Sequence, residues 1–208
     1  MEEQEFKLEV TEPAHFEAIA DAPEIQDRAA GEARTVPMRA DYIDTADLAL
    51  LHAGYAYRVR QEGERWIATV KADLGGDADG GLHRHQEWEA VVTDPTPDLS
   101  VFDDPQLRER LAAIRGERPL ITLFRVDMER RVQMLDLPGG SQAEWAADRG
   151  RIVAGDQEET VCEVELELKA GPLPPLRSFI DQLQQRYPLR PDNRTKFARG
   201  LALAGLGG

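Results

Sequence analysis

The chain has 208 residues, enough for one substantial hydrophobic core and too few for much of a second, since domains usually hold ~100–200 residues. A formal net charge of −14 argues against nucleic acid or an anionic membrane as partner, so any anion site must be a local concentration of Arg and Lys. No run approaches the ~18 apolar residues of a membrane span, the acidic amino terminus does not resemble a signal peptide, and the single Cys162 excludes an internal disulfide, so we expect a cytoplasmic protein.

The first half of the chain is predicted to alternate strands with short helices. Residues 3–10 alternate charged and apolar side chains, as a strand with two different faces does, and Thr11 and Pro13 indicate the start of a helix that ends near Asp21. Residues 22–32 form either a second helix or a loose connection. The segments that follow are a strand at 34–44, a helical turn at 45–53 stopped by Gly54, a hairpin of strands 55–61 and 65–71, a loop at 72–81 and a strand at 86–92.

The second half is predicted to contain longer strands. A proline-rich connector leads to a helix at 104–115, with Pro105 at its first position and Gly116 as its stop. The remaining predicted elements are strands at 121–137, 142–148 and 160–169, the first two joined across 138–140, a break at 172–175, a helix at 176–186 and a short helix at about 196–204.

Charged residues recur at alternate positions of nearly every predicted strand. In the first strand Glu3, Glu5 and Lys7 share a face, and two such carboxylates next to a lysine could hold a divalent cation beside an anion. The other charged sets are Arg58 with Arg60, Lys71 after Thr69, Glu87 with Glu89, Arg125 to Arg131 in steps of two, Glu144 with Asp148, and Glu163, Glu165, Glu167 and Lys169. For any single strand, a sheet with one wet face explains the pattern.

Mixed charge on one face of six or more strands favours a different architecture. A closed sheet with a charged interior and helices on its apolar outside would produce this inversion of the usual pattern. Buried charges must be paired, hydrated or bound to ligands, because an isolated buried charge is costly. A lumen with carboxylates for a metal and Arg and Lys for phosphate satisfies that requirement.

The segment Glu3-x-Glu5-x-Lys7 resembles the E-x-E-x-K signature of the CYTH superfamily, the triphosphate tunnel metalloenzymes. Further segments follow in that family's order: Tyr42-x-Asp44-Thr45, Leu51-x-x-Gly54, Arg58-x-Arg60, Thr69-x-Lys71, Gly80-Gly81-Leu82-His83 with Glu87, Leu123-Phe124 with Arg125 and Arg130, Asp148-x-Gly150, Glu163-x-Glu165-x-Glu167, and Lys196-x-x-Arg199-Gly200. The resemblance covers nearly the whole chain and is closest to bacterial inorganic triphosphatases. Those often continue into a helical polyphosphate-associated domain, which we expect to be absent here.

The resemblance implies a mainly β (α+β) fold, in which eight antiparallel strands close into a triphosphate tunnel with helices outside, as a single domain over residues 1–208. It implies Mg²⁺ or Mn²⁺ as cofactor and a small-molecule triphosphate as substrate. The implied metal ligands are Glu3, Glu5, Asp148, Glu163 and Glu165. The implied substrate-binding residues are Lys7, Arg58, Arg60, Lys71, Arg125, Arg130 and Lys196. The implied catalytic residues are Glu3, Glu5, Lys7, Glu163 and Glu165.

The sequence leaves two questions about the basic residues: which arginine of the strand at 121–137 faces inward, and which basic residue precedes the fifth predicted strand. Strict alternation along the strand at 121–137 puts Arg125 and Arg131 inward and Arg130 outward, whereas the motif favours Arg130, and a β-bulge would reconcile the two. Relatives commonly have a basic residue just before the fifth predicted strand. Here that residue is either Arg84 or His85.

The metal ligands and the general base are also incompletely assigned. Glu165-x-Glu167-x-Lys169 repeats the opening spacing, which we interpret as a coincidence of strand alternation. The repeat leaves open which two of Glu163, Glu165 and Glu167 would bind the metal that the resemblance implies. The base is either a carboxylate near the metal or a lysine with a depressed pKa.

The resulting hypothesis is metal-dependent hydrolysis of inorganic triphosphate to diphosphate and phosphate. Within the family, hydrolysis of thiamine triphosphate or nucleoside triphosphates and class IV adenylate cyclisation are the alternatives. The scarcity of aromatic residues on the charged faces argues against a stacked organic group. Outside catalysis, a module that binds polyphosphate and a ligand-free barrel are the competing hypotheses. The sequence allows a monomer or a homodimer.

Overall fold

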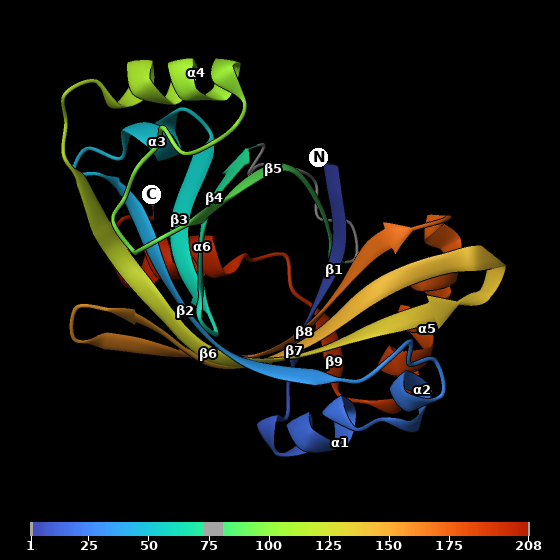
Figure 1. Ribbon diagram of the computed structural model, residues 1–208. Helices are drawn as coiled ribbons and strands as arrows, with labels where there is room; N and C mark the ends of the chain where they lie inside the picture. Colours follow the sequence, from blue (N-terminus) through green and yellow to red (C-terminus); the bar gives the residue numbers. More distant parts are fainter. Residues whose placement is uncertain (1, 73–80, 208) are drawn as a thin grey trace.

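The structure, a computed structural model, describes residues 2–72 and 81–207, without the side chains of residues 2 and 3. Nine strands are found there: β1 (Glu2–Val10), β2 (Arg34–Thr45), β3 (Tyr55–Glu62), β4 (Arg65–Ala72), β5 (Leu82–Val92), β6 (Leu120–Leu137), β7 (Ser141–Ala154), β8 (Gln157–Ala170) and β9 (Leu189–Pro191). Eight of them close an antiparallel barrel, because β1 pairs with β5 along its first half and with β8 along its second (Figure 1). The predicted mainly β fold with a closed eight-stranded barrel is confirmed.

Helices occupy the connections between the strands. They are α1 (Phe16–Ala20), α2 (Pro23–Gln26), α3 (Ala49–His52), α4 (Pro105–Arg115), α5 (Leu173–Arg186) and α6 (Lys196–Leu203), with short 3₁₀ turns at Pro13–His15 and Pro138–Gly140. The start of α4 is as predicted, since the Asp104 carboxylate accepts hydrogen bonds from the amides of Gln106 and Leu107 at 2.9 and 3.1 Å. Among the described helices, none has the length and apolar character that crossing a membrane requires.

Some predicted boundaries differ from the observed ones. The helix α5 begins at Leu173 rather than 176, because Pro174 and Pro175 lie in its first turn, where a missing N–H breaks no helical hydrogen bond. Thr11 is not a helix cap, and its hydroxyl donates to the carbonyl of Pro188 instead. The strands β7 and β8 continue to a tight turn after Ala154, and β9 was not predicted. Most of the predicted loop at 72–81 lies outside the described residues.

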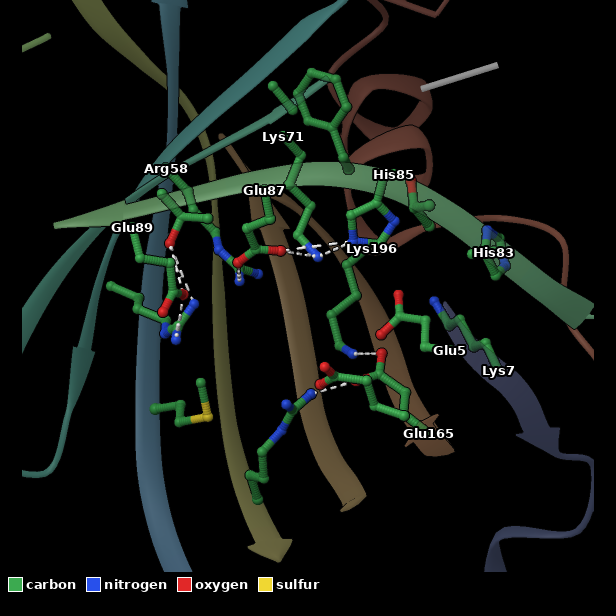
Figure 2. Close-up of a pocket in the computed structure, with 18 of the residues that line it drawn as sticks. Glu5, Lys7, Arg58, Lys71, His83, His85, Glu87, Glu89, Glu165 and Lys196 are labelled. Carbon is green, nitrogen blue, oxygen red and sulfur yellow. Dashed lines mark hydrogen bonds and ion pairs between the residues drawn. The ribbon is translucent and has the colours of Figure 1, made fainter. Parts of the chain in front are cut away.

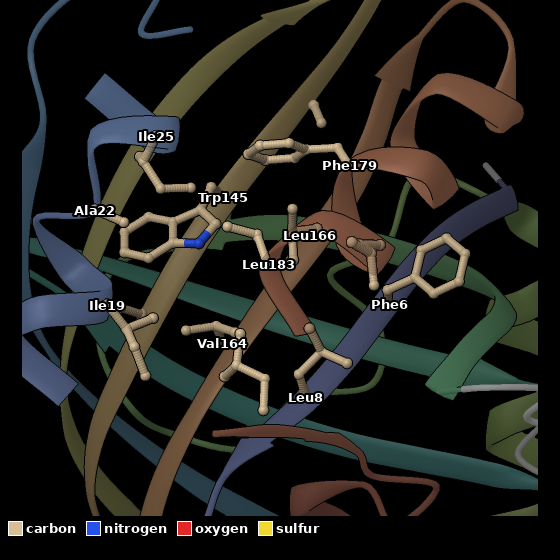
Figure 3. Close-up of a cluster of buried hydrophobic side chains, with 14 of the residues drawn as sticks. Phe6, Leu8, Ile19, Ala22, Ile25, Trp145, Val164, Leu166, Phe179 and Leu183 are labelled. Carbon is tan, nitrogen blue, oxygen red and sulfur yellow. The ribbon is translucent and has the colours of Figure 1, made fainter. Parts of the chain in front are cut away.

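The outer face of the barrel carries apolar residues that helices cover. Between β1, β7 and β8 on one side and α1, α2 and α5 on the other lies a core centred on the fully buried Trp145 (Figure 3). A second core, with Tyr57 and Val70 from the barrel, lies under α4, which contributes Leu107 and Leu111. Burial of this apolar surface at about 25 cal/mol per Å² stabilises the barrel from outside and leaves its lumen to polar residues.

The helix α6 is the exception, because it packs on the inner face of the barrel. Phe197 and Leu201 of α6 join a third core with Tyr42, Phe124 and Ile152, which belong to inward-facing positions of β2, β6 and β7. Phe197 stacks on Tyr42, with ring centroids 5.6 Å apart. Figure 1 shows α6 within the outline of the barrel. The lumen is therefore apolar where α6 fills it and charged elsewhere.

Candidate active site

A cavity of about 380 Å³ lies inside the barrel, within the usual size range of small-molecule sites. The charged residues that line it are Glu5, Lys7, Arg58, Arg60, Glu62, Lys71, Arg84, Glu87, Glu89, Arg130, Glu144, Glu165, Glu167, Lys169 and Lys196. All four lysines of the chain are among them. Positive charge is thus concentrated inside a protein whose net charge is strongly negative.

Three carboxylates converge on one side of this cavity. Asp148 of β7 and Glu163 and Glu165 of β8 each place an oxygen within 4.8 Å of the others. The register between the two strands sets this geometry, because Asp148 and Glu163 are directly opposite each other. Asp148 and Glu163 are 0% and 1% exposed, so they need cationic partners to remain ionised.

Lys196, the first residue of α6, binds all three carboxylates. Its ammonium donates to Asp148 Oδ2 at 2.7 Å and to Glu163 Oε1. It also donates to Glu165 Oε1 at 2.8 Å (Figure 2). Burial lowers the pKa of Lys196, but attraction by the three carboxylates outweighs burial and holds that pKa well above its usual value. Lys196 is therefore a cation at neutral pH.

Arg130 of β6 is the second partner of the cluster. Its Nε and Nη2 form a fork on Asp148 with distances of 2.7 and 2.6 Å, and Nη2 also donates to Glu165 Oε2 at 2.5 Å. Burial raises the pKa of Glu165, but Lys196 and Arg130 outweigh that effect and hold the pKa well below its usual value.

Two further cations bind Glu163. Lys7 Nζ lies 3.1 Å from Glu163 Oε1 and donates to the carbonyl oxygen of Arg194 at 2.8 Å. Arg199, one turn after Lys196 in α6, donates from Nη1 to Glu163 Oε2 at 2.9 Å and from Nε to Glu159 at 2.7 Å. The carboxylate cluster is therefore enclosed by cations from β1, β6 and α6.

The opposite wall of the cavity comes from β3, β4 and β5. Lys71 Nζ lies 2.5 Å from Glu87 Oε2 and 2.7 Å from His85 Nε2 (Figure 2). Arg58 Nη2 is 3.7 Å from Glu87 Oε1, and Arg60 Nη2 is 2.9 Å from Glu89 Oε1. These residues come from inward-facing positions of three paired strands, as the alternation of the sequence indicated.

The arginines of this wall have hydrogen-bonding capacity to spare. Within the described part of the chain, Arg58 Nε and Arg60 Nε are buried donors without a hydrogen-bond acceptor, although Arg60 Nε lies 3.5 Å from Glu62 Oε2. Burial and the neighbouring charge of Arg58 lower the pKa of Arg60. Unsatisfied buried donors beside like charges are costly, and an anionic ligand would satisfy both of them.

The structure corrects the orientation of β6. Arg130 lines the cavity, whereas Arg131 bonds Asp21 and Arg125 bonds Asp41 at 2.6 Å, with Arg125 outside the cavity wall. The inward face of β6 is the one that carries Phe124, so strict alternation was applied to the wrong face. No bulge is needed between positions 125 and 131, where β6 keeps continuous register with β7. The predicted tunnel position of Arg125 is therefore wrong.

Only some of the predicted metal ligands line the cavity. Glu5, Glu165 and Glu167 line the cavity, while Asp148 and Glu163 do not. The side chain of Glu3 lies outside the described residues. In Figure 2 the Glu5 carboxylate points into the cavity beside Lys196.

Several residues of the site were not assigned from the sequence. Lys169 and Glu144 line the cavity and follow the inward alternation of their strands, which is the signal that would have found them. Arg199 lies three residues after Lys196, a spacing that places two side chains on one side of a helix. Of the two basic candidates before the fifth strand, His85 contacts Lys71 and Glu87.

A family model described as the CYTH domain matches residues 1–201. The chain belongs to the CYTH domain family. Its resemblance to that family, based on short motifs, is thereby confirmed.

The chain is also similar to individual proteins in sequence or in structure. An inorganic triphosphatase from Haemophilus influenzae is 28% identical over 163 residues, which cover 78% of this chain and 44% of that protein. The chain thus spans less than half the length of that relative. A putative adenylyl cyclase from Hippeastrum described as having dominant triphosphatase activity has the same fold, with a TM-score of 0.66, 15% identity and coverage of 96% of this chain and 95% of that one. A putative adenylate cyclase from Bacillus halodurans gives a TM-score of 0.55, 14% identity and coverage of 95% and 97%.

Two residues of the CYTH motifs have structural roles. Asp44 is buried and caps α3, accepting hydrogen bonds from the amides of Leu50 and Leu51, both at 2.9 Å. Gly200 allows α6 to approach β6, since a Cβ at this position would lie 2.1 Å from the ring of Phe124. Asp44 thus holds α3, which lies between β2 and β3 in the chain, and Gly200 sets how closely α6, the helix that carries Lys196, approaches β6.

The donor set of the CYTH cavity fits a hard divalent cation. Asp148, Glu163 and Glu165 offer only carboxylate oxygens, the ligands that Mg²⁺ and Mn²⁺ prefer, and Glu5 lies on the cavity wall nearby. A phosphate chain would supply further oxygens.

Proposed function

We propose that this CYTH domain hydrolyses inorganic triphosphate to diphosphate and phosphate, with Mg²⁺ or Mn²⁺ as cofactor. The observation that carries the proposal is the pair of buried Nε donors of Arg58 and Arg60, which have no hydrogen-bond acceptor among the described residues. Both arginines line a cavity that Glu165 of the carboxylate cluster also lines. A polyanion would accept hydrogen bonds from both arginines. A divalent cation between the polyanion and the carboxylates would offset the repulsion between their negative charges. The triphosphatase relative from Haemophilus influenzae supports the same reaction class.

The residues divide into two groups in this proposal. Arg58, Arg60 and Lys71 bind phosphate oxygens at one wall, where they exchange part of their present pairing with Glu87 and Glu89 for the substrate. Arg130, Lys7 and Lys196 bind them at the other wall. The proposed metal ligands are Glu5, Glu163 and Glu165, with Asp148 beside them and Glu3 carried over from the family motif.

Little covalent chemistry is needed from the protein. Phosphoryl transfer proceeds through a loosely bonded transition state whose charge resides on oxygen, so positioned cations lower the barrier directly. A bound divalent cation would supply additional positive charge at those oxygens. A carboxylate that faces the cavity and does not hold the metal can accept a proton from an attacking water.

Nucleotides are the weaker candidate substrates because, among the described residues that line the cavity, no Phe, Tyr or Trp ring is free to stack on a base. Tyr42 and Phe197 reach its wall, but both are more than 90% buried and stack on Phe124 or on each other. A nucleoside esterified to one end of the phosphate chain would also remove one negative charge from the terminal phosphate. We therefore expect kcat/KM for inorganic triphosphate to exceed that for ATP at least about a hundredfold, which corresponds to roughly 2.7 kcal/mol of differential transition-state binding.

Steady-state phosphate release at equal Mg²⁺ and pH tests this proposal. Glu5→Gln should abolish turnover of triphosphate, whereas Glu9→Gln, the same change on the same strand, should not, since Glu9 bonds Arg190 at the surface. A preference for ATP, or formation of cyclic AMP, would move the protein to the nucleotide branch of the family. Full activity of Glu5→Gln at saturating Mg²⁺ would refute the metal assignment.

We further propose that residues 1–208 act as one domain, because β1, at the start of the chain, closes the barrel by pairing with β8 and also pairs with β9, late in the chain. The cytoplasmic location and the choice between monomer and homodimer stay predictions from the sequence.

A further inference from the structure

Every oxygen of the clustered carboxylates already has a cationic partner. Arg130 binds both oxygens of Asp148 and one of Glu165, Arg199 binds one oxygen of Glu163, and Lys7 binds the other. Lys196 binds one oxygen of each carboxylate. A divalent cation could use only the remaining lone pairs of these oxygens, and it would lie beside the positive charges of the four side chains.

Lys196 is the partner that contacts most of the clustered carboxylates. Its departure would leave Glu165 Oε1 without a cation and would remove one of the two cations from Asp148 Oδ2 and from Glu163 Oε1. Among the described cations, it alone contacts all three carboxylates, and the three N–H donors of an ammonium match three oxygens. It also lines the cavity, whereas Asp148 and Glu163 do not, so it lies between these carboxylates and the cavity space.

Simultaneous occupation by Lys196 and a metal is electrostatically unfavourable. Metal–oxygen bonds of Mg²⁺ are about 2.1 Å long, so a dication bound to the same oxygens would lie very close to the ammonium. At such distances in a buried site, repulsion between like charges amounts to several kcal/mol. Displacement of the lysine costs less, because its ammonium can move into the adjacent cavity.

We propose that Lys196 is an internal substitute for the metal: it holds the carboxylates together in the metal-free protein and is displaced into the cavity when a divalent cation binds. This inference rests on the metal site of the proposed function. Its consequence is an order of events, since the ammonium becomes available to phosphate only after the carboxylates have released it. Metal and triphosphate should therefore bind with positive coupling, each raising the affinity for the other by the same factor.

Calorimetric titration with Mn²⁺ alone, without substrate, provides the first test. Lys196→Met keeps the length of the side chain and removes its charge, so we expect it to bind Mn²⁺ at least tenfold more tightly than the wild type. The control Arg151→Met also removes one positive charge, but at an exposed site paired with Glu158, and should change the affinity less than twofold. Equal or weaker binding by Lys196→Met would overturn the inference and leave the proposed function standing. Absence of Mn²⁺ binding in all three proteins, together with metal-independent hydrolysis, would refute both this inference and the proposed function.

A second test uses the wild-type protein and so does not depend on the folding of a variant. Limited acetylation with an N-hydroxysuccinimide ester, read by peptide mass spectrometry, reports the accessibility of each lysine amine. Saturating Mn²⁺ should raise the acetylation rate of Lys196 several-fold and change that of Lys71 little, because Lys71 contacts Glu87 rather than the cluster. An unchanged or lower rate at Lys196 would show that its ammonium stays on the carboxylates.

Discussion

Replacement of Gly200 by alanine tests whether the close approach of α6 to β6 positions Lys196. The added Cβ would lie 2.1 to 2.4 Å from three ring atoms of Phe124, where ordinary contact begins at 3.4 Å. The ring cannot turn away freely, because it stacks on Tyr42 with centroids 4.7 Å apart. Helix α6 must therefore move by about 1 Å or the aromatic core must repack, and overpacking of this kind costs roughly 1–3 kcal/mol.

The opposing term is the better helix propensity of alanine, worth about 1 kcal/mol. We expect Gly200→Ala to lower the free energy of unfolding by up to about 2 kcal/mol, the difference of these two terms. Its kcat for triphosphate should fall by up to about a hundredfold, since a 1 Å misplacement in an active site has effects of that size. Urea denaturation and phosphate release measure the two quantities.

The control Ala202→Gly changes an exposed position of the same helix in the opposite sense. It should lose about 0.5–1 kcal/mol of stability and keep normal kcat. If Gly200→Ala were more stable than the wild type, helix propensity would dominate and the steric reasoning would be refuted.

Two further predictions concern charge. Arg58→Ala should raise KM for triphosphate and lower kcat, reducing kcat/KM at least about tenfold. The kcat/KM of the control Arg125→Ala should stay within about twofold of the wild-type value, because the ion pair of Arg125 with Asp41 lies outside the cavity. Near-normal kinetics of Arg58→Ala would place that residue outside the substrate path. The depressed pKa of Glu165 means that its contribution to stability is present above the unfolded-state value of about 4.3 and is lost as the pH falls through the folded-state value. In metal-free urea titrations the stability difference between wild type and Glu165→Gln should thus be constant near pH 7 and shrink below about pH 4, and a difference that grows on acidification would contradict the ion-pair assignment.

The sequence by itself determined the class of fold and most of the cavity wall. Alternation along a strand is a local property that depends only on backbone geometry, so Arg58, Arg60 and Lys71 could be assigned to one face without knowledge of their neighbours. The helix α4 was predictable for a similar reason, because Asp104 caps it through amides two and three residues away. Charge on one face of many strands then indicated a closed barrel with a polar lumen.

Only the tertiary structure decided which face of β6 is internal and what the charges contact. Arg125 and Arg130 both belong to a charged pattern, and the choice between them depends on register with β2 and β7, which are distant in sequence. The position of α6 inside the barrel could not be predicted from the sequence either, because a short amphipathic helix packs equally well outside a barrel. The meeting of Lys196 with Asp148, Glu163 and Glu165 follows from that packing, since contacts between residues over thirty positions apart are set by how elements pack rather than by local spacing.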